Sequence, residues 1–164
     1  MEITAYQLAE RFAGIKEIGG DMDNPQIMAM LKLDAGWPEH DEVPWCSAFT
    51  NYIAWLLKLP RSKSLRARSW LEIGRPVSLK EAQIGFDVVI IGRGKWQPGP
   101  ETIKAPGHVG FFAGWHGLEV SGDLGVMHIL GGNQGNTVST KSFELKPDEE
   151  GEGSRLLGIR RLLD

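Results

Sequence analysis

The chain carries a single cysteine, Cys46, within the segment DEVPWCSAFT at residues 41–50. Pro44 precedes it by two residues, and proline is typical of the first turn of a helix, so we expect Cys46 to lie where a helix begins. Free backbone N–H groups and the helix dipole favour the thiolate there, which is the nucleophilic form of cysteine. A cysteine that only packs in the core is the alternative, because free cysteine is among the most buried residue types.

A cysteine nucleophile needs a base, and histidine suits this role because its pKa lies near neutrality. Of the four histidines, His40 and His116 fall in polar segments and His128 lies in an apolar run, where an ordinary half-buried histidine is expected. His108 instead opens the run HVGFFAG. Period-two alternation places His108 and Gly110 on one face, so that Gly110 leaves room beside the imidazole for a helix end or a substrate.

A third polar group normally fixes the imidazole tautomer by accepting its other N–H. Two amides, Asn133 and Gln134, follow the apolar run VMHILGG, and either can accept this hydrogen bond. We expect Asn133 to do so, with Gln134 as the alternative. The letters GGNQGN are equally typical of an ordinary turn.

The elements expected to position these residues are helices in the first half of the chain and strands in the second. Apolar spacing predicts helices over 4–17, after Asn24-Pro25, over 45–57 and around 65–74. From about residue 85, four short β-rich runs divided by Gly, Pro and Asn predict an antiparallel sheet, namely FDVVIIG, HVGFFAG, VMHILGGN and RLLGIRRL. The fold class is therefore α+β, with N-terminal helices packed on a small antiparallel sheet.

Composition bounds the domain count and the partners. With 164 residues, 41% of them hydrophobic, we expect one domain over 1–164. The net charge of −3 argues against nucleic acid as a partner. The densest basic stretch, Arg61–Arg68, is either a solvated connection or a surface that steers anions. No run approaches the ~20 apolar residues of a membrane span or resembles a signal peptide, and one cysteine suits folding in a reducing cytoplasm.

Three motifs in this order, PWCSAF (44–49), GHVGF (107–111) and GNQ (132–134), resemble the CHAP/NlpC-like cysteine peptidase and amidase superfamily, papain-like enzymes that include many phage endolysins. The likeness spans about residues 5–145. It implies hydrolysis of an amide bond of peptidoglycan through an acyl-enzyme, with Cys46 as nucleophile at a helix N-terminus, His108 as base and then acid, and Asn133 as orienting group. Some CHAP members carry a glutamate where this chain has Gly131, which leaves Asn133 and Gln134 both open as the third residue.

Aromatic and acidic residues raise questions of substrate and metal binding. We expect Trp37, Trp45, Trp115 and the amide Gln134 to contact substrate. Core packing is the alternative for most of the indoles, and for Trp45 we expect both; Trp96 is a further loop tryptophan. Asp21 and Asp23 suggest calcium, but helix capping by Asp23 or Asn24 is the preferred interpretation. Zinc held by Cys46, His108 and His128 would lack closely spaced ligands, so we expect no metal and no cofactor.

We therefore expect a bacteriolytic hydrolase of the endolysin type, a single catalytic domain without a wall-binding module. It would be a monomer, made in the cytoplasm and released by a holin or a secretion device to act on the cell wall. A secreted antibacterial effector and a tail-associated lysin are alternatives. So is a non-catalytic domain of the same fold that binds peptidoglycan or a partner, with Cys46 as packing. The bond that is cut, in the stem peptide or between glycan and peptide, stays open.

Overall fold

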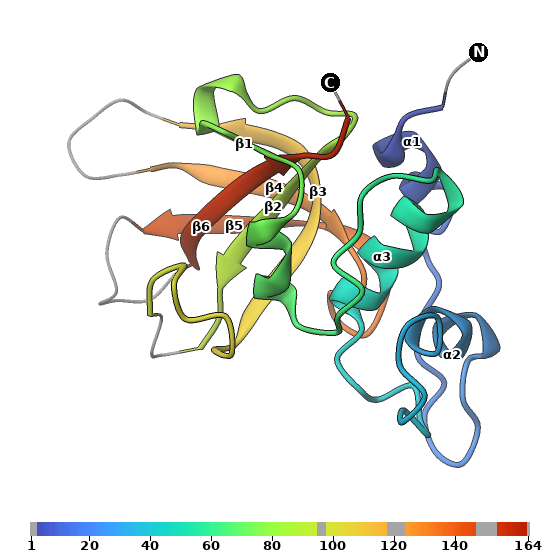
Figure 1. Ribbon diagram of the computed structural model, residues 1–164. Helices are drawn as coiled ribbons and strands as arrows, with labels where there is room; N and C mark the ends of the chain where they lie inside the picture. Colours follow the sequence, from blue (N-terminus) through green and yellow to red (C-terminus); the bar gives the residue numbers. More distant parts are fainter. Residues whose placement is uncertain (1–2, 95–97, 118–123, 147–153, 164) are drawn as a thin grey trace.

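Short helices lie together beside a strongly curved sheet in the computed structural model, which describes residues 3–94, 98–117, 124–146 and 154–163 (Figure 1). The α-helices are α1 (Ala5–Glu10), α2 (Pro25–Leu31) and α3 (Cys46–Leu56), and the 3-10 helices are η1 (Ala67–Glu72) and η2 (Leu79–Glu81). The strands are β1 (Arg75–Val77), β2 (Asp87–Gly92), β3 (Gly107–His116), β4 (Val126–Gly131), β5 (Ser139–Lys146) and β6 (Ser154–Arg161). The predicted α+β class is confirmed.

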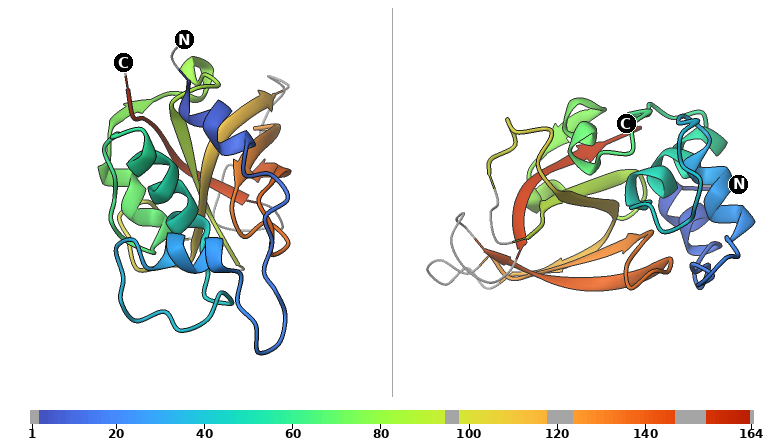
Figure 2. Two further views of the ribbon diagram at one scale, coloured as in Figure 1. Left: turned by 90° about the vertical axis from the view of Figure 1, so that its right-hand side faces the viewer. Right: turned by 90° about the horizontal axis from the view of Figure 1, so that it is seen from below.

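The sheet is antiparallel except where it closes on itself. Its strand order is β1-β6-β2-β3-β4-β5, and β5 also pairs with β6 in parallel, with Leu145 opposite Ser154 and Lys146 opposite Arg155. This closure gives the sheet the barrel-like curvature that is visible from below (right panel of Figure 2). A curved sheet has an inner and an outer face, and each carries its own buried cluster.

The two clusters divide the core between the inside of the sheet and the helix layer. The inner cluster is apolar and includes Val89, Ile91, Phe112, Met127, Ile129, Leu145 and Ile159. The outer cluster joins one face of β2 and β3 to the helices and includes Trp45, Phe49, Ile53, Trp70, Val88, Ile90, Val109 and Phe111. The predicted alternation along β3 is confirmed, because Val109 and Phe111 pack outward and Phe112 packs inward.

Helix α1 is shorter than the predicted helix over 4–17. Its start follows the expectation, since Thr4 caps it in a reciprocal capping box with Gln7. After Glu10 the chain turns and pairs with the segment before β5: Gly14 N–H donates to Val138 O at 2.9 Å, and Val138 N–H donates to Ile15 O at 2.8 Å. These bonds to a distant segment replace the next helical turns. Helix α2, by contrast, begins at Pro25 with Asn24 as its cap, as predicted.

A buried arginine secures the segment that leads into β3. Arg68, on η1, is fully buried; its Nε donates to Pro106 O at 3.0 Å, and its Nη1 donates to Pro98 O at 2.9 Å and Gly99 O at 2.8 Å. The expectation that Arg61–Arg68 is a solvated or anion-steering stretch is wrong for Arg68. Its guanidinium instead satisfies backbone carbonyls that would otherwise be buried without partners, and so fixes where β3 begins.

Within the described ranges, no helix is both long and apolar enough to cross a membrane.

Candidate active site

Cys46 is the first residue of α3, where the sequence places it. Its neighbour Trp45 occupies the cap position and makes no side-chain capping bond, so the first N–H groups of the helix are not taken by a cap. The side chain is 4% exposed and packs in the outer cluster against β3. The sulfur thus lies between a helix start and the strand that begins with His108.

Burial raises the pKa of the Cys46 thiol, against the expectation from its position at a helix start. The backbone N–H groups of Val109, Ser47 and Cys46 itself face the sulfur and favour the thiolate, as does the positive charge of Arg93. Loss of hydration outweighs these contributions. The resting side chain is therefore a neutral thiol, and it needs a base to take its proton. Val109, whose backbone N–H faces the sulfur, directly follows His108 on β3. His108 is therefore the base nearest to the thiol along this strand.

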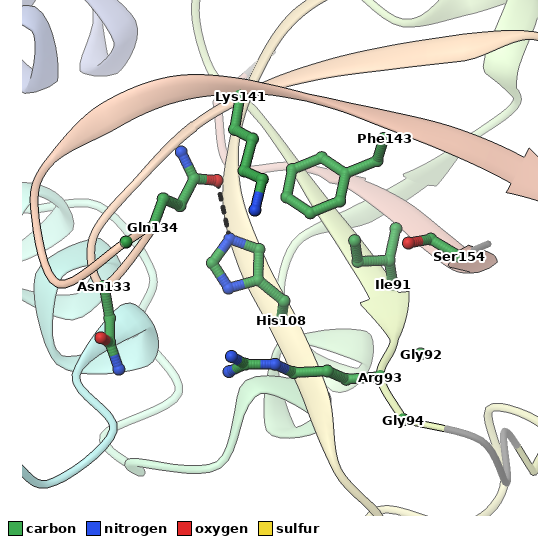
Figure 3. A pocket seen from close by; sticks show the side chains of 11 residues that line it. Ile91, Gly92, Arg93, Gly94, His108, Asn133, Gln134, Lys141, Phe143 and Ser154 are labelled. Atoms are coloured by element: carbon green, nitrogen blue, oxygen red, sulfur yellow. Dashed lines mark hydrogen bonds between the residues drawn. The ribbon is translucent and has the colours of Figure 1, made fainter. Parts of the chain in front are cut away.

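His108 forms its hydrogen bond with Gln134, not with Asn133. Nε2 of His108 lies 2.8 Å from Oε1 of Gln134, and both side chains are buried (Figure 3). The Gln134 amide is held in turn, since its Nε2 donates to Ile129 O at 3.1 Å and to Ser139 O. Both donors of the amide are used, so Oε1 can only accept, and Nε2 of His108 must carry the proton. The lone pair of the neutral imidazole is then on Nδ1, which is free to receive a proton from a thiol.

Asn133 lies in the same turn as Gln134 but does not contact His108. Its φ of 57° lies in the left-handed region, and its side chain points away from the imidazole–amide pair (Figure 3). The expectation that Asn133 orients His108 therefore does not match the structure, because the turn after β4 directs the next residue back toward the imidazole. Backbone N–H of Gln134 closes this turn on Thr137 O at 3.0 Å. Asn133 remains at the rim of the adjacent pocket.

Glycines around the imidazole make this arrangement possible. A Cβ on Gly131 would lie 3.2 Å from Gln134 Oε1 and 3.3 Å from His108 Nε2, so position 131 leaves the space that the Gln134 amide fills. The structure gives a different reason for glycine at position 110 than the expected one. A Cβ there would lie 2.7 Å from Leu130 O, so Gly110 lets β4 approach β3 closely and does not leave room for a helix end or substrate.

The pKa of His108 is lowered to about 4, first because burial disfavours the charged imidazolium. The hydrogen bond to Gln134 raises this pKa, while the positive charges of Arg93 and Lys141 lower it further. The positive charge of Arg93 thus lowers the pKa of both the thiol and the imidazole, and Arg93 lines the cavity beside His108. At neutral pH the site holds a thiol and a neutral imidazole, ready for proton transfer once a substrate is attacked.

A cavity of about 150 Å³ opens beside His108 (Figure 3). Its walls come from the end of β2, the starts of β3 and β6, the turn after β4, and β5. Ile91 and Phe143 are its apolar part, and Arg93, Lys141 and Ser154 are polar. Sequence reasoning missed Arg93 and Lys141. Neither residue had a clear signal, because the letters STKSFELK around Lys141 are mostly polar and Arg93 directly follows strand β2, where a Gly- and Pro-rich loop begins.

Two of the tryptophans expected to bind substrate are not placed to do so. Trp45 is fully buried, and its Nε1 donates to Glu17 Oε1 at 2.8 Å, so its ring is core. Trp115 is at the far end of β3 from His108, where its Nε1 donates to Leu124 O at 2.7 Å. Trp37 is 66% exposed and lines a separate surface hollow together with Pro44 and Lys63. Trp96 lies outside the described residues.

Several residues that were considered as metal ligands, with no metal expected, make other contacts. Asn24 caps α2, while Asp23 accepts from the backbone N–H of Asp41 at 2.9 Å and so does not cap the helix. His128 contacts His116 (Nε2 to Nδ1, 3.2 Å) and Ser142, so the set of Cys46, His108 and His128 considered for zinc is not brought together. Among the residues that the structure describes, no three His, Cys, Asp or Glu side chains gather in a metal-binding group.

None of the protein-family models and none of the curated proteins matches the sequence. Among solved structures, NlpC1 from Trichomonas vaginalis is similar, with a TM-score of 0.51 and 16% sequence identity. The match covers 96% of this chain and 42% of that one, so this chain spans less than half the length of that protein. At such low identity the likeness shows the fold: this chain has an NlpC-like fold.

Proposed function

We propose that this protein is a cysteine-dependent amidase or endopeptidase that hydrolyses an amide bond of bacterial peptidoglycan. The observation that carries the proposal is the hydrogen-bonded pair of His108 and Gln134, which leaves Nδ1 of the imidazole able to take a proton. His108 lies on β3, and Cys46 packs against this strand from the start of α3. The NlpC-like fold supports it, and the choice of peptidoglycan follows from the motif resemblance. Trp37 stays a proposed contact for the substrate.

The mechanism would run through an acyl-enzyme. Cys46 Sγ attacks the carbonyl carbon as its proton passes to His108 Nδ1, and the imidazolium is stabilised by Gln134 Oε1. The C–N bond then breaks, and His108 gives the proton to the leaving amine. Water, deprotonated by His108, attacks the thioester and regenerates the thiol, leaving a carboxylate. The first N–H groups of α3 are suited to hold the oxyanion.

The test is loss of optical density of a suspension of purified peptidoglycan, with the wild type compared with Cys46→Ala and Cys46→Ser. We expect both variants to lose at least about 1,000-fold in rate, since the nucleophile has no substitute. Circular dichroism checks that they fold. Lysis by Cys46→Ala at the wild-type rate would contradict the assignment of the nucleophile.

A non-catalytic wall-binding domain is the second candidate, favoured by the burial of Cys46 and the raised pKa of its thiol. In that case the wild type would sediment with peptidoglycan and release no fragments. The catalytic protein is expected to release fragments in the same experiment, so the two candidates separate cleanly.

A further inference from the structure

The cavity beside His108 brings two positive charges to one small volume. Arg93, at the end of β2, and Lys141, on β5, reach toward the imidazole from different sides (Figure 3). Both line the cavity together with His108, and their positive charges lower the pKa of its imidazole. None of the described carboxylates forms an ion pair with either side chain. In a chain of net charge −3, two exposed cations that meet at one cavity, with no acidic partner among the described residues, make this cavity a candidate site for an anion.

The apolar part of the cavity limits what an anion bound there can look like. Ile91 and Phe143 form one wall, and Lys141 Nζ lies 5.8 Å from the centre of the Phe143 ring. A volume of about 150 Å³ is smaller than the roughly 300 Å³ at which pockets for whole small molecules begin. The cavity therefore suits one part of a longer ligand, with a short carbon chain against the apolar wall and a carboxylate at the cations.

The position of the cavity decides which part of a substrate would enter it. His108 lines the cavity and Cys46 does not. In cysteine hydrolysis the acyl part stays on the sulfur, while the histidine hands its proton to the leaving amine. Because His108 lines the cavity and Cys46 does not, the leaving-group fragment is a better candidate occupant than the acyl part.

We propose that this cavity binds a carboxylate of the leaving-group fragment, held by Arg93 and Lys141 with its carbon chain against Ile91 and Phe143. The protein then prefers amides whose leaving amine carries an acidic group close to the scissile nitrogen. This inference rests on the proposed hydrolase function. A bound carboxylate also offsets the repulsion of the two cations on the imidazolium, so an acidic substrate helps His108 to accept the proton.

The first test measures binding without catalysis. In the Cys46→Ala protein, N-acetylalanine and N-acetylalaninamide are titrated while the imidazole resonances of His108 are followed by NMR. Two ion pairs at the exposed side chains of Arg93 and Lys141 predict an affinity about tenfold higher for the acid than for the amide. In Arg93→Gln/Lys141→Met the ratio is expected to fall to about one. Arg11→Gln/Lys32→Met, which removes the same charges from the exposed ends of α1 and α2, keeps the tenfold ratio.

The second test measures turnover of peptides that differ only in a free carboxylate or a carboxamide on the leaving residue. We expect kcat/KM to favour the acid about tenfold, and the Arg93/Lys141 double variant to lose this preference while it still cleaves the amide. Cleavage of both peptides at equal rates, or a preference that survives the double variant, overturns the carboxylate site and leaves the hydrolase intact. Preferential binding of the acid with cleavage of neither peptide contradicts the hydrolase and keeps the carboxylate site.

Discussion

Gln134 is the residue on which the orientation of His108 depends. Its two N–H groups are anchored on Ile129 O and Ser139 O, and its carbonyl oxygen faces the imidazole. An amide fixed in this way defines the tautomer without adding a negative charge to the buried site. The tautomer matters because only an unprotonated Nδ1 can take the thiol proton.

Replacement of Gln134 by alanine is therefore expected to lower kcat by roughly 100-fold, at the lower end of the effect of acid–base catalysis. The imidazole would lose its orienting acceptor while the thiol stays in place. The matched control is Asn133→Gly, which keeps the left-handed turn at φ 57° and should cost much less. Equal losses in the two variants, measured on the same peptide substrate, would return the orienting role to Asn133.

The burial of His108 also predicts how stability depends on pH. The pKa of His108 is about 4 in the folded state and ~6.5 in an unfolded chain. Between these two pH values the unfolded state binds a proton at His108 and the folded state does not. The free energy of unfolding should fall by about 3 kcal/mol between pH 6.5 and pH 4 from this group alone.

Urea titrations at several pH values measure this dependence. His108→Asn should remove most of that loss, whereas His40→Gln, at a side chain that is 69% exposed, should leave it unchanged. A pH dependence of stability identical in wild type and His108→Asn would show that His108 is not buried neutral.

Part of this site could be predicted from residue types alone. Cys46 at a helix start and His108 at a strand start follow from Pro44 and from the alternation of HVGFFAG, which are local signals. The choice between Asn133 and Gln134 could not be made, because it depends on backbone angles of the turn after β4. The raised pKa of the Cys46 thiol could not be predicted either, because it depends on burial by residues distant in sequence.

At the scale of elements, the contact between α3 and the end of β4 holds the two halves of the site together. Gly132 follows β4, and a Cβ there would lie 2.6 Å from the Trp45 ring and 2.7 Å from Phe49 Cβ. The absence of a side chain at this position thus lets the first turn of α3 sit against the turn that carries Gln134.

Gly132→Ala is expected to destabilise the protein by about 1–3 kcal/mol, because the buried ring and helix cannot move aside without loss of packing. Gly36→Ala is the matched control, since a Cβ there meets nothing within 4 Å. Thermal unfolding of both variants checks the prediction. Equal stability of the two variants would mean that α3 does not press against Gly132.

Element prediction succeeded where the pattern is local and failed where partners are distant. Helices α2 and α3 begin close to where capping and apolar spacing place them. Strand β5 was missed because only one of its faces is covered, so its letters STKSFELK read as polar. Helix α1 was predicted too long, since nothing in its own sequence shows that residues 14–17 pair with the segment before β5.

At the scale of the whole molecule, the closed sheet sets the geometry of the site. β3 supplies His108, its neighbour β4 leads to Gln134, and β2 and β5 bring Arg93 and Lys141 to the same end. The helix layer adds Cys46 from the outer side of the sheet. The NlpC-like fold thus places residues from four strands and one helix around one imidazole, although this chain spans 42% of the NlpC1 chain that it resembles.

The central claim is that Cys46 transfers an acyl group of a peptidoglycan amide to water. The most direct measurement is mass spectrometry of fragments released from purified peptidoglycan in water enriched in ¹⁸O. We predict fragments with one new carboxylate that carries one ¹⁸O atom, formed by the wild type and absent with Cys46→Ala. The masses would also name the bond that is cut. The same labelled fragments from Cys46→Ala, or intact peptidoglycan after incubation with the folded wild type, would contradict the account.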